Sequence, residues 1–146
     1  DLFLALMTSW LDEVDGMFQS ASDLADNVPE AFGNMAQISG QLFEALKGGF
    51  PILLEFWTQA SRQPVFWEQA VAPYRRFLDF FASIIKAGID EGTFEEYLDP
   101  EPTARIVMAV AMGLMLQATF DPADTNWQEV TQLGIRMILS GMRRIE

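Results

Sequence analysis

The sequence predicts an all-α fold, and three features of the chain support that class. Apolar residues recur at spacings of three and four rather than two, which is the helical period. Half of the 146 residues are hydrophobic and 12% are aromatic, so the chain can bury a core of ordinary size. Proline and glycine divide the apolar pattern into about six helices. We therefore expect residues 1–146 to form a single domain.

The first expected helix covers residues 2–21, with its apolar side chains on one face and its acidic ones away from it. That face is mainly core, and its aromatic members Trp10 and Phe18 are also candidates to line a pocket. Residues 22–29 are polar and end in Val28-Pro29, which predicts a loop.

Two helices follow this loop. The first opens at Pro29 or Glu30, carries Phe43 on its inner face and ends at Gly48-Gly49. The next begins at Phe50-Pro51 with Trp57 facing inward. It closes at Gln63-Pro64, because the residue before a proline disfavours the helical conformation.

The longest pattern runs over residues 65–91, where two lines of apolar side chains lie beside each other, so this helix must be covered from two directions. The first line is Trp67, Val71, Tyr74, Leu78, Phe81, Ile85 and Ile89, and the second is Phe66, Pro73, Phe77, Phe80 and Ile84. Pro73 lacks a backbone donor and clashes with the preceding turn, so we expect a kink or break between Gln69 and Pro73.

Gly88 and Gly92 lie where that pattern ends, and glycine tolerates the left-handed backbone found just past helix ends. Asp99 then offers a side-chain cap and Pro100 the fixed φ of a first turn, so a new helix begins at about residue 100. Residues 106–116 of this helix are apolar on every side, but the run is too short to cross a bilayer.

The last helix is expected from Asp124 or Thr125, either of which can cap it, to about Arg143. Gly134 and Gly141 lie seven residues apart on its main apolar face and let another helix approach closely. That face consists of Trp127, Val130, Thr131, Gly134, Ile138, Gly141 and Met142.

Charge and composition exclude several function classes. With 21 acidic and nine basic residues the net charge is −12, so this chain alone should repel the phosphates of DNA. The absence of Cys and His excludes thiol chemistry, Ser-His-Asp triads and His-based or thiolate metal sites, and no cofactor is implied. No pair of acids falls on an apolar helical face, so we do not expect an enzyme. The start shows no recognisable signal peptide, and the lack of Cys fits a reducing compartment.

The motif G-I-x-E-G-x-F at residues 88–94 is followed by D-P-x-x-x-A-R at 99–105, by an apolar helix with Gly113-Leu114 and Gln117, and by Asp121-Pro122. This series resembles the C-terminal regulatory domain of the TetR family of bacterial transcription regulators. The start, Asp1-Leu2-Phe3, resembles the helix that follows directly after that family's helix-turn-helix domain.

The resemblance implies an orthogonal helical bundle whose last two long helices form a four-helix bundle with a second copy. It also implies a cytoplasmic regulator, which we expect to be a repressor, with DNA contacted only through a helix-turn-helix domain upstream of Asp1 and no membrane partner. The apolar surplus of the last two helices favours the same homodimer. The alternative is that both helices are simply core. The expected interface residues are Ile106, Val110, Gly113, Gln117, Trp127, Val130, Gly134, Ile138, Gly141 and Met142.

The other helices of the family enclose a cavity for a small effector, which we expect to be hydrophobic or amphipathic. The candidate ligand-binding residues are Trp10, Phe18, Phe43, Trp57, Tyr74, Phe77, Phe81, Met108 and Met112. Met108, Met112 and Met115 form the adaptable side of the central helix, so we assign that side to the ligand and the side of Ile106 and Val110 to the partner. Candidate polar contacts are Tyr74, which we favour, and Ser39, Gln41, Thr58, Gln117 and Thr119. A helical interaction module without a ligand is the alternative function.

Overall fold

The structure is a computed structural model that describes residues 2–45, 49–121 and 123–146, without the side chains of residues 4 and 43–45. The described residues form six α-helices, which confirms the all-α prediction. These are α1 (Leu2–Asp23), α2 (Val28–Ala45), α3 (Phe50–Ser61), α4 (Pro64–Asp90), α5 (Pro100–Phe120) and α6 (Trp127–Met142).

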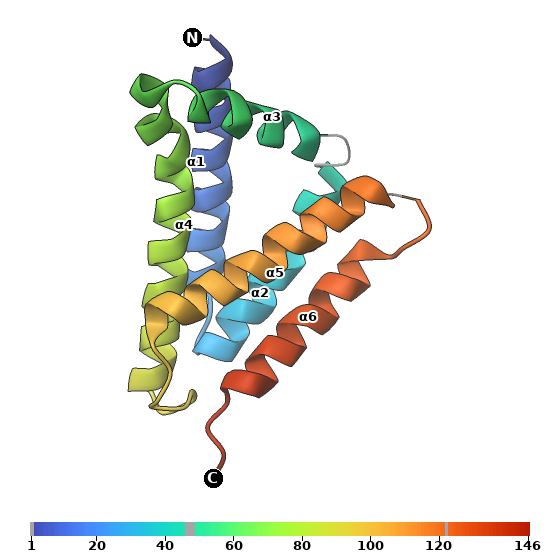
Figure 1. Cartoon of the computed structure of the whole chain (residues 1–146). Helices are drawn as coiled ribbons and strands as arrows, with labels where there is room; N and C mark the ends of the chain where they lie inside the picture. The colour runs from blue at the N-terminus through green and yellow to red at the C-terminus, as the bar shows by residue number, and fades with distance from the viewer. Residues whose placement is uncertain (1, 46–48, 122) are drawn as a thin grey trace.

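The helices form two groups that meet at an angle, as Figure 1 shows. In one group α1 and α4 run side by side, and α3 crosses the end at which α1 begins. In the other group α5 and α6 lie diagonally, with α2 behind α5. The groups are joined because α5 packs on α4, and α2 packs on both α1 and α6. Side chains from all six helices meet where the two groups cross.

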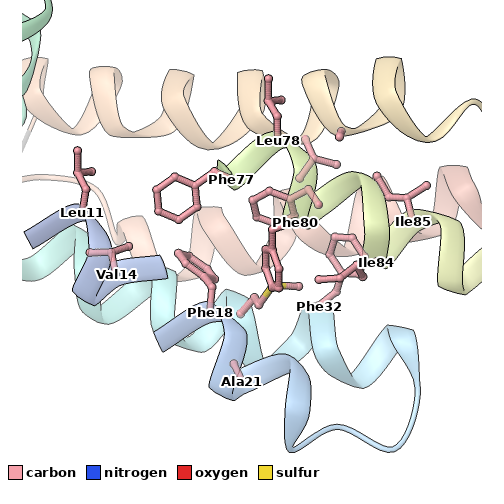
Figure 2. Packing of buried hydrophobic residues seen from close by; sticks show 14 of the residues in the cluster. Leu11, Val14, Phe18, Ala21, Phe32, Phe77, Leu78, Phe80, Ile84 and Ile85 are labelled. Atoms are coloured by element: carbon pink, nitrogen blue, oxygen red, sulfur yellow. The ribbon is translucent and has the colours of Figure 1, made fainter. Parts of the chain in front are cut away.

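Aromatic rings from α1 and α4 make the centre of the core. Phe18 packs edge to face against Phe77 and Phe81, with ring centroids 6.0 and 6.1 Å apart. Figure 2 shows these two helices presenting Phe18 and Phe77 to each other, with Ile84 and Ile85 further along α4. Phe77, Leu78, Phe80, Phe81, Ile84 and Ile85 are all buried, so α4 is covered from two directions as its sequence predicts.

The end of α4 differs in one respect from the sequence prediction. Gly92 has a φ of +80° and ends the helix, whereas Gly88 lies inside it. The ring of Phe94, which is fully buried, folds back against Gly88. A Cβ at residue 88 would stand closer than 3.0 Å to that ring, so Gly88 permits close packing rather than a helix end.

The C-terminal tail closes over the same region. The backbone N–H of Glu95 donates to the carbonyl of Met142, and that of Arg144 donates to the carbonyl of Thr93. Arg144 also pairs with Glu96 at 3.1 Å. The loop between α4 and α5 is therefore held to the end of α6.

One local prediction was wrong, and a second was wrong in part. Asn126 caps α6 by accepting a hydrogen bond from the Glu129 N–H at 3.2 Å, so that helix begins at Trp127 rather than at Asp124 or Thr125. Pro73 does not break α4, which continues through it to Asp90, so of the expected kink or break only the kink stays a prediction. The predicted cap at Asp99 is confirmed, since its side chain accepts from the Glu101 N–H at 3.3 Å.

Candidate functional site

A cavity of about 160 Å³ lies in the space between the two helix groups, and every helix contributes to its wall. Its lining residues are Trp10, Leu11, Val14, Phe18, Phe32, Met35, Ser39, Leu42, Leu53, Trp57, Tyr74, Phe77, Phe81, Val107, Met108, Val110, Ala111, Met112, Leu114, Met115, Thr131, Ile135 and Ile138. An apolar cavity of this composition is typical of a small-molecule site.

Most of the polar groups in the wall are already satisfied by the chain. The Ser39 hydroxyl donates to the carbonyl of Met35 at 2.8 Å, and the Thr131 hydroxyl donates to that of Trp127 at 2.7 Å. The indole N–H of Trp57 donates to the carbonyl of Ala70 at 3.2 Å. Ala70 lies in the turn before Pro73, where the missing proline N–H alters the usual pattern of helical hydrogen bonds. The cavity therefore offers few free donors or acceptors.

No charged side chain stands in this wall among the residues that the structure describes. Five basic groups form ion pairs near the surface, for example Arg75 with Glu68 at 2.6 Å and Arg76 of α4 with Asp12 of α1. The hydrogen bond to Glu68 and the charge of that carboxylate raise the pKa of Arg75. Within the described ranges no group of acidic side chains could hold a metal ion.

The outer sides of α5 and α6 carry apolar residues at spacings of three and four, and most of these residues are exposed. We call these residues the outer stripe: Ile106, Ala109, Gly113, Leu116 and Phe120 on α5, and Val130, Leu133, Met137 and Gly141 on α6. Ile106 is 62% exposed, Phe120 76% and Met137 66%. A repeat of three and four places such residues along one seam of a helix. The stripe is the kind of surface that a packed partner helix covers.

The helix α5 is, by length and composition alone, long and apolar enough to cross a membrane. This differs from the sequence estimate, which counted only residues 106–116. Only 11% of the most apolar window of α5 is buried within the chain. Such a composition also occurs in core helices, and α5 packs on α4 along its other side.

A family model for the C-terminal domain of BetI-type transcriptional repressors, a TetR group, matches residues 51–140, which are 90 of the 146. The chain belongs to the TetR family. No curated protein sequence matches it. The family is one of regulators rather than enzymes, so the expectation of no catalysis agrees with it.

Two solved TetR-family structures share the fold. One is the ketosteroid transcriptional regulator KstR2 of Mycobacterium tuberculosis, with a TM-score of 0.74 and 19% identity over 92% of this chain and 68% of that one. The other is the transcriptional regulator FadR of Bacillus subtilis in complex with stearoyl-CoA, with a TM-score of 0.77 and 13% identity over 98% of this chain and 76% of that one.

Eight of the nine residues that the sequence suggested for a ligand lie in the cavity wall. These are Trp10, Phe18, Trp57, Tyr74, Phe77, Phe81, Met108 and Met112, and the side chain of the ninth, Phe43, lies outside the described residues. Met115 joins Met108 and Met112 there, so the thioether side of α5 faces the cavity. Whether a TetR effector binds them stays a prediction.

Only some of the polar residues suggested as ligand contacts lie in the cavity wall. Tyr74 and Ser39 line the cavity, whereas Gln41, Thr58, Gln117 and Thr119 do not. The hydroxyl of Thr58 donates within its own helix at 2.8 Å, and that of Thr119 does so at 3.1 Å. Thr131 lines the cavity but was not among the candidates, because the sequence grouped it with the partner-facing side of α6.

The residues suggested for a dimer do not share one surface. Ile106, Gln117 and Gly141 are exposed, and Gly113 and Val130 are half-buried. The others face inward, since Trp127 and Met142 are buried, Val110 and Ile138 line the cavity, and Gly134 packs against Val110 and Leu114 of α5. The indole N–H of Trp127 donates to the carbonyl of Asp121 at 2.9 Å, which turns this side of α6 toward α5.

Proposed function

We propose that the chain is the effector-binding and dimerisation domain of a cytoplasmic TetR-type repressor, and that its effector is small and hydrophobic. The observation that carries the proposal is the central cavity, whose wall comes from all six helices and is almost entirely apolar. Apolar walls with a few polar groups are the usual form of small-molecule sites.

The structural neighbours support a hydrophobic effector. One is named for ketosteroids and the other is bound to stearoyl-CoA, and both of these molecules have large apolar parts. At identities of 19% and 13% the neighbours support the fold of this chain but do not identify its ligand. The proposed ligand class is therefore inferred from the residues that line the cavity of this chain.

Dimerisation is supported by the outer stripe. Covering its side chains with the same stripe of a second copy would form a four-helix bundle from α5 and α6 of each copy. Such an interface should bury more than about 1,200 Å² in total to be stable. A second copy accounts for the exposed apolar side of α5, so we assign this surface to a protein partner rather than to a membrane.

In this arrangement α5 separates the ligand from the partner. Met108, Met112 and Met115 face the cavity, whereas Ile106 and Leu116 lie on the outer stripe. A ligand that displaces the thioethers can therefore shift the helix that the second copy contacts. We propose that DNA is bound by a separate domain, because the charge of −12 opposes binding by this chain.

Bromine quenching of tryptophan emission tests the cavity directly. Trp10 and Trp57 line it, whereas Trp67 and Trp127 do not. We expect 1-bromooctane to quench the emission of the unmodified chain in a saturable way. Quenching should disappear in the Trp10→Phe/Trp57→Phe double variant and persist in the matched Trp67→Phe/Trp127→Phe variant.

Two results would count against this function. Quenching that rises linearly without saturation, equally in both double variants, would mean contact with the surface only. A dimer that forms normally while no apolar probe binds would favour the alternative, an interaction module without a ligand.

A further inference from the structure

The cavity lacks ionic groups, and this limits what can occupy it. Among the described residues its wall contains neither Lys, Arg, Asp nor Glu. Burying an ion without an opposite charge costs far more than burying a neutral group of the same size. A ligand that enters whole should therefore be uncharged.

An anionic head group would also find poor conditions near the bundle. Five basic side chains are engaged with acids in the ion pairs Arg75–Glu68, Arg76–Asp12, Lys86–Asp90, Arg105–Glu101 and Arg144–Glu96. The net charge of −12 opposes the approach of anions. The other described basic residues, Arg62, Arg136 and Arg143, are exposed and lie outside the cavity wall, so the described residues supply no built site for a carboxylate or a phosphate at this cavity.

A cationic ligand is disfavoured for a different reason. Aromatic faces attract cations, and Trp10, Trp57 and Tyr74 line the cavity, but Phe18 is packed edge to face with Phe77 and Phe81. No carboxylate in the described wall balances a buried positive charge. The attraction of the aromatic rings would have to offset the whole loss of hydration.

Among the described residues that line the cavity, Tyr74 and Trp10 are the two side chains that can donate a hydrogen bond to a ligand. Ser39, Thr131 and Trp57 already donate to backbone carbonyls. In the described part of the chain no hydrogen bond engages the hydroxyl of Tyr74 or the indole N–H of Trp10. These residues stand on the neighbouring helices α4 and α1 and both line the cavity, and each side chain can donate one hydrogen bond to a ligand oxygen.

We propose that the cavity selects an uncharged, apolar ligand with a single hydroxyl or carbonyl oxygen, which Tyr74 and Trp10 bind. This inference rests on the proposed function, because it names the ligand class of the same cavity. The volume of about 160 Å³ is close to the roughly 150 Å³ of an apolar cavity that admits benzene, so small probes suit the test.

Three probes with an eight-carbon chain separate the possible ligand classes by calorimetry on the unmodified chain: 1-octanol, octanoate at pH 8 and octyltrimethylammonium. We expect 1-octanol to bind at least about ten-fold more tightly than either ion. Equal or tighter binding of an ion would overturn the inference and leave the proposed function standing. If neither these probes nor 1-chlorooctane binds, the proposed function fails as well.

The polar contact has its own test. Tyr74→Phe should weaken 1-octanol binding by about 2- to 10-fold, the worth of one hydrogen bond, and leave 1-chlorooctane unchanged. Tyr97→Phe is the matched control, because Tyr97 is 78% exposed and lies outside the cavity wall. Equal losses for both probes, or no loss for 1-octanol, would remove Tyr74 from the recognition of the ligand oxygen.

Discussion

The ring of Phe94 lies against Gly88 of α4, in the space that a side chain at residue 88 would need. Phe94 is fully buried and also packs edge to face with Phe32 of α2, at a centroid distance of 6.2 Å. One glycine therefore allows the loop after α4 to reach the core. In the G-I-x-E-G-x-F motif, the first position must be glycine because of this contact with Phe94. The second, Gly92, suits glycine because its φ is +80°.

Alanine at two helical glycines should have opposite effects on stability. Gly88→Ala should destabilise the chain by about 1–3 kcal/mol, because its Cβ meets the Phe94 ring. Gly16→Ala is the control, since nothing lies within 4 Å of its Cβ, and it should stabilise by about 0.5–1 kcal/mol. Urea denaturation gives both values. If Gly88→Ala stabilised the chain, the Phe94 ring could not lie against residue 88 as described.

The position of the cap on α6 can be tested in the same way. Asn126→Ala should cost about 1 kcal/mol of unfolding free energy, since it removes the acceptor of the Glu129 N–H. Asp124→Ala should change little, because Asp124 is exposed and lies two residues before the cap. If Asp124→Ala instead lost more unfolding free energy than Asn126→Ala, α6 would begin where the sequence predicted.

The outer stripe should set the oligomeric state. Met137→Glu places a carboxylate where two copies would meet, so we expect sedimentation to change from dimer to monomer at micromolar concentration. Val65→Glu is the control, because Val65 is 80% exposed at the start of α4 and lies outside the stripe. A monomeric unmodified chain, or a Met137→Glu variant that stays dimeric, would contradict the assignment.

The isolated chain should not bind DNA specifically. Its net charge of −12 repels the negatively charged phosphates of DNA. Fluorescence anisotropy of labelled duplexes should show no sequence-dependent binding from 50 to 200 mM salt. Salt-sensitive retention of one duplex would refute this expectation.

Much of the fold follows from local rules. The start of α5 at Asp99-Pro100 and the end of α4 at Gly92 were predictable, because a cap, a fixed φ and a left-handed backbone are properties of single residues. The start of α6 was harder, since Asp124, Thr125 and Asn126 are consecutive and all can cap.

The faces of the helices were only partly predictable. Seven aromatic side chains line the cavity, and six of them had been assigned to it because they lie on inward faces: Trp10, Phe18, Trp57, Tyr74, Phe77 and Phe81. The seventh, Phe32 of α2, was not among the candidates. For α6 the apolar residues surround the helix, so periodicity does not say which side turns inward. Contacts such as that of Gly134 with Val110 decide this, and they depend on the tertiary fold.

The central claim is that α5 contacts a ligand on one side and a second copy on the other. Met112 lines the cavity, and its neighbour Gly113 lies on the outer stripe with nothing within 4 Å of its Cβ position. Met112→Trp and Gly113→Trp therefore place the same ring on two different sides of one helix, about 100° apart around its axis. The two variants should be compared by calorimetry with 1-octanol and by sedimentation.

We expect Met112→Trp to fill the cavity, so that it loses 1-octanol binding and remains a dimer. Gly113→Trp should keep ligand binding and become monomeric, because the ring separates helices that must approach closely. If both variants lose the same property, or if Met112→Trp breaks the dimer and binds 1-octanol normally, α5 does not separate ligand from partner.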